Sequence, residues 1–212
     1  MKGILLIFGL AFSLVNAAPL VVCFGDSITK RGYNELLGPL VGAETVNAGV
    51  GGHNTKQGLH RMQKDVLDHD PAVVVILFGT NDVRVDSERA YVLLEQFEKN
   101  LEEMVKRSRK AGAEVVMCTL PPINEKKYFT RHKLEDFIAH GGLKKLLADY
   151  RGATMNVAKR NKVPLVDLNQ VLENHPKWIS PDGVHPSKEG TAIIAKLVAE
   201  KVKPLLMKEA GK

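Results

Sequence analysis

Short apolar runs alternate with longer amphipathic stretches along most of this chain. The clearest run, Ala72 to Phe78 (AVVVILF), is continuous, rich in β-branched residues and free of polar–apolar alternation. That pattern is typical of a central parallel strand buried on both faces. The other runs of strand length are 20–24, 44–47, 114–120 and 163–168.

Helical periodicity marks the stretches between these runs. From Ser87 to Lys110 apolar residues recur mostly every three or four positions, which predicts one long amphipathic helix. Residues 123–142 are charged and irregular, and their pattern predicts no single element. Further helices are predicted over 31–40 (ended by Gly38-Pro39), 55–67, 143–160 and 187–202.

Strands that alternate with helices predict an α/β fold. We expect a three-layer α/β/α, flavodoxin-like domain with a doubly wound, mostly parallel, five-stranded sheet. Right-handed crossovers then place the carboxyl ends of all strands at one edge of the sheet, where such folds bind ligands. The chain has the length of one domain, which we expect to occupy residues 18–212, after a signal peptide at 1–17.

The N-terminal residues have the pattern of a secretory signal peptide. A positive start is followed by an almost wholly apolar stretch, 3–15, and then by Ala17 and Ala18, which suit a cleavage site. The apolar stretch is short for a membrane span, although an N-terminal anchor helix is the alternative. We therefore expect cleavage near Ala17/Ala18, a secreted or periplasmic protein, and no stable membrane insertion after cleavage. Cys23 is a poor lipidation site because it lies inside a predicted strand, after Val22.

Two cysteines, Cys23 and Cys118, lie in the first and fourth predicted strands. In the flavodoxin-like order the third strand runs between those two. Two strand spacings are roughly 9.6 Å, which exceeds the ~7 Å between Cα atoms that a disulfide can bridge. The sequence therefore predicts two buried free thiols.

Composition excludes several classes of partner. The net charge is +6 and the pI is near 9.2, which could favour anionic partners. The basic residues are nevertheless spread along the predicted helices, without a basic run interleaved with aromatics, so we expect no nucleic-acid partner. The histidines show no metal-ligand spacing with cysteines or acids, so we expect no metal site. The oligomeric state is open.

Polar residues cluster where the predicted strands end. Ser27 follows the first strand and Gly25, which allows a sharp turn, so it is either a helix cap or a nucleophile. Asn81 follows the central strand. Asp182 precedes His185 by three positions, so its carboxylate can hold one imidazole nitrogen and leave the other free to take a proton from a serine.

Four blocks together resemble the SGNH hydrolase superfamily, also called GDSL esterases. They run in the family's order over nearly the whole mature chain: Phe24-Gly25-Asp26-Ser27, Asn47-Ala48-Gly49-Val50-Gly51-Gly52, Gly79-Thr80-Asn81-Asp82 and Asp182-Gly183-Val184-His185-Pro186. The resemblance implies Ser27 as nucleophile, His185 as general base and Asp182 as its orienting acid. It also implies an oxyanion hole made by the Ser27 amide, the Gly52 amide and the Asn81 side chain.

The glycine loop leaves one choice open. Gly52 is in register with family members that carry an acidic residue immediately after it, and here His53 stands in that place. Gly49 is the alternative oxyanion donor. Asp26 is expected to hold the turn rather than to react.

The resemblance implies hydrolysis of a carboxylic ester through an acyl-enzyme, with no metal and no organic cofactor. Predicted export, a 6% aromatic content and the lack of a long apolar lid segment favour a short acyl group, such as acetyl on a carbohydrate. The alternatives are a lysophospholipase or thioesterase for longer chains and, from another class, a non-catalytic saccharide-binding module. Residues 123–142 and the loop around Trp178 are expected to line the substrate site, and Arg84 to touch the substrate.

Overall fold

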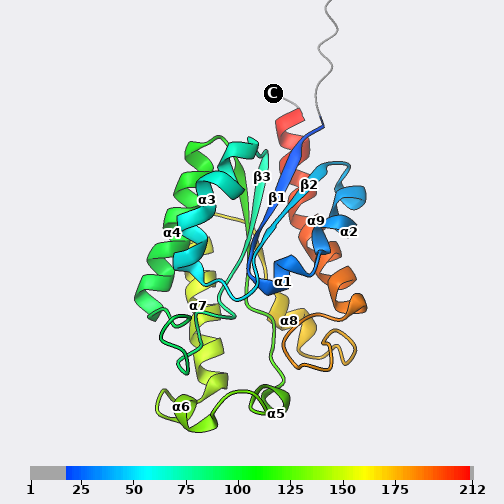
Figure 1. Ribbon diagram of the computed structural model, residues 1–212. Coiled ribbons are helices and arrows are strands. Elements are labelled where there is room, and N and C mark those ends of the chain that lie inside the picture. The colour runs from blue at the N-terminus through cyan, green and yellow to red at the C-terminus, as the bar shows by residue number, and fades with distance from the viewer. Residues whose placement is uncertain (1–17, 211–212) are drawn as a thin grey trace, which may run out of the picture.

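Five parallel strands form one sheet, in the order β2-β1-β3-β4-β5 (Figure 1). The structure is a computed structural model, and it describes residues 18–210. The strands are β1 Leu20–Gly25, β2 Glu44–Gly49, β3 Val73–Leu77, β4 Glu114–Cys118 and β5 Leu165–Val166. The order reverses direction at β1 and β3, as in a doubly wound fold. The predicted fold class is confirmed.

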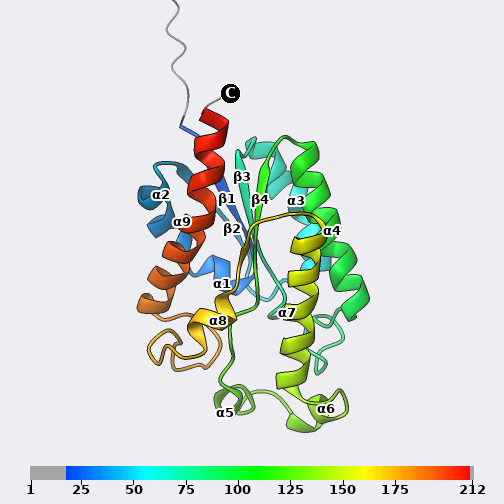
Figure 2. The same ribbon diagram turned by 180° about the vertical axis from the view of Figure 1, so that it is seen from behind.

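Helices cover both faces of this sheet. Helices α3, α4 and α7 lie on one face and α2 and α9 on the other, as the two opposite views show (Figures 1 and 2). The helices are α1 Ser27–Lys30, α2 Tyr33–Val41, α3 Thr55–Asp65, α4 Leu94–Lys110, α5 Glu125–Tyr128, α6 Leu134–Ile138, α7 Leu143–Arg160, α8 Leu168–Leu172 and α9 Lys188–Ala210, with a 3₁₀ turn, η1, at Leu67–His69.

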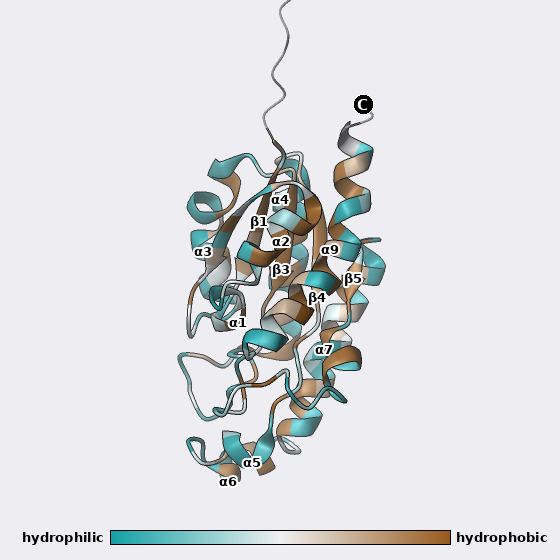
Figure 3. Ribbon diagram, turned by 90° about the vertical axis from the view of Figure 1, so that its right-hand side faces the viewer, coloured by the Kyte–Doolittle hydropathy of each residue, from teal (hydrophilic) through white to brown (hydrophobic). Residues whose placement is uncertain are grey.

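Strand residues alternate between two hydrophobic cores. Val22 and Phe24 of β1 pack on the side of α3, α4 and α7, whereas Val21 and Cys23 pack on the side of α2 and α9. Each fully buried side chain of this size contributes roughly 1.5–3 kcal/mol relative to an exposed one. Figure 3 shows the strands as largely hydrophobic beneath helices of mixed character. The continuous apolar sequence of β3 thus reflects burial on both faces.

The two cysteines are free and buried, as predicted. Because β3 lies between β1 and β4, Cys23 and Cys118 are two strand positions apart in the sheet. Burial raises the pKa of the Cys23 thiol to about 12, which keeps it protonated and unreactive.

Helix α4 begins seven residues later than predicted, at Leu94 instead of Ser87. The carbonyl of Ser87 accepts hydrogen bonds from the amides of Ala90 and Tyr91, so this segment forms turns. The amide of Val92 donates to the carbonyl of Asp82 and fixes the end of that turn region. The apolar periodicity continued through the turns because their side chains also face the core.

Three other predicted boundaries were wrong. Helix α2 continues through Pro39 to Val41 and ends at Gly42, whose φ of 67° suits a glycine. A proline one turn from the end of a helix removes only one backbone hydrogen bond, which the packing of α2 against α9 offsets. Helix α9 extends to Ala210, and β5 contains only Leu165–Val166.

Candidate active site

Ser27 is the first residue of α1, immediately beyond the end of β1. Only glycine fits at Gly25, because a Cβ there would lie 2.4 Å from the carbonyl oxygen of Leu77. Asp26 is buried and caps α1: its Oδ1 accepts a hydrogen bond of 2.8 Å from the amide of Ile28. The tight turn and the cap together fix the direction in which Ser27 projects from the carboxyl edge of the sheet.

Three predicted side chains lie in a hydrogen-bonded row. Ser27 Oγ is 2.8 Å from His185 Nε2, and His185 Nδ1 is 2.8 Å from Asp182 Oδ2. Asp182 Oδ1 accepts from the backbone amides of Val184 and His185, each at 2.9 Å. The carboxylate is therefore held by its own loop, and it holds the imidazole with Nε2 directed at the serine. This arrangement can pass a proton from a serine hydroxyl to a histidine.

The Asp182 carboxyl remains ionised in this setting. Burial alone would raise its pKa, but hydrogen bonds from the His185 and Val184 amides and from the His185 ring lower it well below its usual range. A permanent negative charge at this position stabilises an imidazolium on His185.

The two candidate oxyanion donors are Gly49, the last residue of β2, and Gly52 in the loop that follows, and their surroundings differ. The Gly49 amide already donates to Asn47 Oδ1 at 3.0 Å, and a Cβ on Gly49 would lie 2.3 Å from the Lys30 amide nitrogen. Gly52 has a φ of 78° and open space around it. Gly49 thus serves close packing, which favours Gly52 as the donor; its role stays a prediction.

Asn81 links two strand ends. Its Nδ2 donates a 3.0 Å hydrogen bond to the carbonyl of His53, the residue after Gly52. An amide nitrogen carries two hydrogens, so one remains for a second acceptor. This bond fixes the Asn81 side chain beside the glycine loop, where the resemblance places it.

Arg61 of α3 was not singled out from the sequence. Its guanidinium donates to the carbonyls of Gly25, at 2.7 Å, and Ala48, at 2.8 Å, near the ends of β1 and β2. It also donates through Nε to His53 Nδ1, at 3.2 Å. Arg61 therefore ties together the strand ends that carry the serine and the glycine loop. An arginine on an amphipathic helix looks solvent-exposed in sequence, and only the fold shows that it turns inward.

Asp82 anchors the other side of the glycine loop. This buried carboxylate accepts hydrogen bonds from the amide and the hydroxyl of Thr55, the first residue of α3. Asn100 of α4 donates to the same hydroxyl, at 2.9 Å. Burial raises the pKa of Asp82 to about 7, and the nearby Asp26 carboxyl, whose own pKa burial raises to about 6, adds to the shift. Two coupled buried carboxyls thus lie directly behind the site.

Because of these two carboxyls, we expect the free energy of unfolding to fall as the pH rises from about 4 to about 7. The folded state binds protons there that the unfolded state has already released, so the free energy of unfolding decreases with pH. For Asp82 alone the loss is on the order of 4 kcal/mol, at about 1.4 kcal/mol per pKa unit. Asp82→Asn is expected to flatten this decline in urea unfolding measured at pH 4, 6 and 8. Asp68→Asn, on the surface, is the control, and equal slopes in both variants would contradict the assignment.

The segment from 123 to 142 contacts the loop that carries Asp182 and His185. The amide of Asn124 donates to the carbonyl of Gly183 at 2.9 Å, and Arg131 donates to the carbonyl of Asp182 at 2.6 Å. In Figure 1 the helices of this segment, α5 and α6, lie beyond the carboxyl edge of the sheet. This position agrees with the predicted substrate-lining role of the segment, which stays a prediction.

Two other residues were singled out from the sequence: Trp178, whose loop was expected to line the substrate site, and Arg84, which was expected to touch the substrate. Trp178 is buried in the core on the α9 side, and the substrate-lining role of its loop stays a prediction. Arg84 is half-buried and pairs with Asp86 at 3.2 Å, and Asp86 is also 2.7 Å from His132 Nδ1. Asp86 thus joins the turn after β3 to the 123–142 segment, and Arg84 pairs with it.

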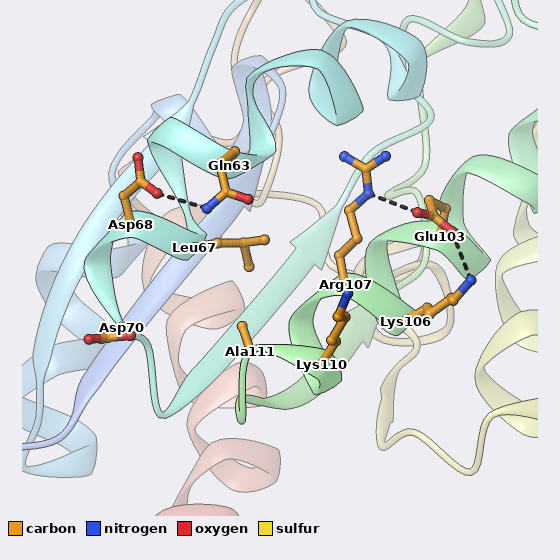
Figure 4. A pocket seen from close by; sticks show the side chains of 9 residues that line it. All are labelled: Gln63, Leu67, Asp68, Asp70, Glu103, Lys106, Arg107, Lys110 and Ala111. Atoms are coloured by element: carbon orange, nitrogen blue, oxygen red, sulfur yellow. Dashed lines mark hydrogen bonds and ion pairs between the residues drawn. The ribbon is translucent and has the colours of Figure 1, made fainter.

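A pocket of about 900 Å³ lies far from Ser27, between η1 and the last turns of α4 (Figure 4). These elements lead into β3 and β4, so the pocket is at the amino edge of the sheet. Most of its polar groups bond one another: Gln63 with Asp68, and Arg107 and Lys106 with Glu103. Side chains that already have partners within the pocket do not suggest a ligand.

Neither a metal cluster nor a membrane span is found in residues 18–210. No three histidine, cysteine or acidic side chains of this part of the chain are grouped to hold a metal ion. No helix within it is long and apolar enough to cross a membrane.

Comparison with known proteins agrees with the geometry. Residues 23–193 match the model of the GDSL-like lipase/acylhydrolase family. The uncharacterized lipoprotein YqeF of Bacillus subtilis is 35% identical over 77% of this chain and 73% of its own length. Thioesterase 1/protease 1/lysophospholipase L1 of Escherichia coli K12 is 26% identical over 76% of this chain and 68% of its own.

Solved structures include close matches in fold. A lipase/acylhydrolase from Enterococcus faecalis superposes with a TM-score of 0.74 at 24% identity, over 88% of this chain and 96% of its own. The acetyl xylan esterase AlAXEase has a TM-score of 0.70 at 26% identity, over 85% and 98% of the two chains. The sequence match over most of the chain, on a fold shared with these hydrolases, places this protein in the GDSL-like lipase/acylhydrolase family of ester hydrolases.

Proposed function

We propose that the protein is a serine esterase that hydrolyses carboxylic esters with short acyl groups. The observation that carries the proposal is the row from Ser27 Oγ through the His185 ring to Asp182, with both hydrogen bonds at 2.8 Å. His185 Nε2 takes the serine proton as Oγ attacks the ester carbonyl. The same nitrogen then returns the proton to the departing alcohol, and water hydrolyses the acyl-enzyme by the reverse sequence of transfers.

The negative oxygen of the tetrahedral intermediate lies against three donors in this scheme. They are the amides of Ser27 and Gly52 and the Nδ2 of Asn81. Removal of one donor of this kind costs about 2.7–4 kcal/mol of transition-state stabilisation. The bond from Asn81 to the His53 carbonyl supports this role, because it orients the amide before substrate arrives. The chemistry needs no metal or organic cofactor.

An acetyl group on a carbohydrate is the substrate we favour. Two relatives are named acetylxylan esterases, from Xylanibacter ruminicola and Geobacillus stearothermophilus, at 25% and 24% identity. The chain spans only 43% of the length of the first, so that protein contains more than the shared domain. Longer acyl chains are the second candidate, because the Escherichia coli relative is named a thioesterase and lysophospholipase. A non-catalytic saccharide-binding module would not need the intact hydrogen-bonded row.

A series of p-nitrophenyl esters from acetyl to palmitoyl tests the proposal. We expect kcat/KM to be highest for acetyl or butyryl and to fall by at least about tenfold towards palmitoyl, which corresponds to about 1.4 kcal/mol. Acetate release from acetylated xylan then tests the carbohydrate. A maximum at long chains would replace the short-chain proposal by the lysophospholipase or thioesterase one. The lack of activity on every chain length would favour a binding module.

We also propose that the protein is exported and cleaved near Ala17/Ala18. Those residues and the predicted signal peptide before them lie at or beyond the start of the described region, and β1 begins at Leu20, just after the site. YqeF is named a lipoprotein, but here Cys23 is buried in the middle of β1, where it cannot carry a lipid. N-terminal sequencing of the exported protein checks the cleavage position.

A further inference from the structure

Four cationic side chains surround the row of Ser27, His185 and Asp182. Lys30 and Arg31 follow the serine at the end of α1, and Lys127 and Arg131 belong to α5 and the turn after it. All four are exposed. They come from two segments about a hundred positions apart, which the fold brings together beside this row.

Contacts fix the position of the pair on α1. The Cδ of Lys30 is 3.9 Å from the place that a Cβ on Gly51 would take, and the Cβ of Ser27 is at the same distance from it. Lys30 therefore runs past the glycine loop beside the serine. An Nη atom of Arg31 is 3.7 Å from Asp182 Oδ2, the oxygen that holds His185.

Contacts also fix the position of the pair on the α5 side. The guanidinium of Arg131 donates to the carbonyl of Asp182 at 2.6 Å. The Cβ of Lys127 would be 2.5 Å from a Cβ added to Gly183, so α5 lies directly on the Asp182–His185 loop. Lys127 and Arg131 thus lie against the Asp182–His185 loop, which Arg31 also contacts.

Few carboxylates neutralise these charges. Within residues 18–210, Lys30, Lys127 and Arg131 form no ion pair, and Arg31 pairs only with Asp182. Elsewhere exposed cations commonly have acidic partners, such as Lys99 with Glu95 and Arg160 with Glu98 and Glu102. Glu35 is the nearby exception: it faces Gly32, next to Arg31. An excess of positive charge therefore remains around Ser27 and His185, and the net charge of +6 of the protein adds to it.

We infer that this site selects esters whose alcohol part carries an anionic group, namely a carboxylate, sulfate or phosphate near the ester bond. The inference rests on the proposed esterase function and specifies its substrate class. An anion bound by Lys30, Arg31 or Arg131 orients the ester toward Ser27, and the positive field raises the rate at which anionic substrates arrive. A uronate or sulfate on an acetylated polysaccharide and a phosphate in a lipid headgroup share this chemistry.

The test compares 4-acetoxyphenylacetate, an anion, with its neutral methyl ester, and measures acetate release from both. The two leaving phenols are chemically similar, so the ratio of their kcat/KM values reports recognition of charge. We expect the wild type to prefer the anion by at least about threefold at low ionic strength. The preference should approach one near 1 M salt, where charges are screened within roughly 3 Å.

Variants assign the effect to residues. Lys30→Gln and Arg31→Gln are each expected to lower the ratio roughly 1.5- to 5-fold, the range for single exposed charge pairs. Lys99→Gln, an equally exposed change on α4, is the matched control and should leave the ratio unchanged. Both esters are cleaved at the same serine, so a variant that is merely damaged loses both rates and keeps the ratio.

The outcomes separate this inference from the proposed function. Hydrolysis of both esters with a ratio of one or less, or with a ratio that neither salt nor the two variants alter, would overturn the inference and leave the esterase. If neither ester were hydrolysed, both the inference and the proposed esterase function would be contradicted. A second comparison identifies the source of the anion: acetylated galacturonan against acetylated xylan, and lysophosphatidylglycerol against monoacylglycerol. Preference for the anionic member of one pair supports the inference and names the source, and equal rates in both pairs contradict it.

Discussion

Ser27→Ala is expected to lower kcat/KM for p-nitrophenyl acetate by at least about 10⁴-fold. Among residues 18–210, the Ser27 hydroxyl hydrogen-bonds with His185 Nε2 alone, so it is the group placed to form the acyl-enzyme. Loss of a nucleophile in enzymes of this type costs about as much as loss of the whole triad, because the groups act as a unit. The remaining rate would come from the oxyanion donors and substrate binding alone.

The stability of the Ser27→Ala variant shows whether its activity is lost because the nucleophile is absent or because the protein is unfolded. Alanine is a good helix former and the change removes one oxygen at the first position of α1, so the melting temperature should stay within a few degrees of the wild type. Ser87→Ala, in the turns before α4, is the matched control for activity. A variant that is folded and keeps more than about a hundredth of the wild-type activity would exclude Ser27 as the nucleophile.

Asp182→Asn is expected to reduce kcat about 10⁴-fold near pH 7 while preserving the loop. An asparagine oxygen can still accept the amides of Val184 and His185, as Oδ1 does now. Its NH₂ group would then face His185 Nδ1, which must become an acceptor. The ring proton moves to Nε2, so the nitrogen that faces Ser27 can no longer take a proton.

Nitrogen chemical shifts of His185 give a direct measurement of that tautomer. The wild type should carry its proton on Nδ1 and the variant on Nε2, with backbone shifts outside the loop unchanged. Asp149→Asn, where the aspartate forms only a surface pair with Lys145, should alter neither the activity nor the tautomer. An Asp182→Asn variant with the wild-type tautomer and full activity would show that the carboxylate does not orient the histidine.

The sequence predicted the sheet and the hydrogen-bonded row because both depend on local patterns. The run from Ala72 to Phe78 could only be a doubly buried strand, and its carboxyl end carries Asn81. The order of the strands was expected from the usual flavodoxin-like arrangement, and with it the separation of Cys23 and Cys118. Motif and spacing predicted three site residues, Ser27, Asp182 and His185. The structure brings all three together.

The errors arose where tertiary contacts override local pattern. Nothing in the periodicity from Ser87 onward shows that the Asp82 carbonyl captures the Val92 amide and delays α4. Arg61 was missed and the burial of Trp178 was not foreseen for the same reason: an arginine that bonds inward and a tryptophan that is buried depend on elements far away in the chain. The partners that turn these side chains inward cannot be located from sequence periodicity.

Ser27 and His185 are 158 positions apart, although their side chains touch. During synthesis the serine, its turn and most of the sheet exist long before the histidine has been made. His185 is then held by a loop between the β5 side of the sheet and α9, the last helix, which packs against α2 and the central strands. The enzyme should therefore acquire activity in a single late event, when the C-terminal helix docks. Turnover of an ester is thus a measure of complete folding. Nascent chains that stop before α9 should show no esterase activity.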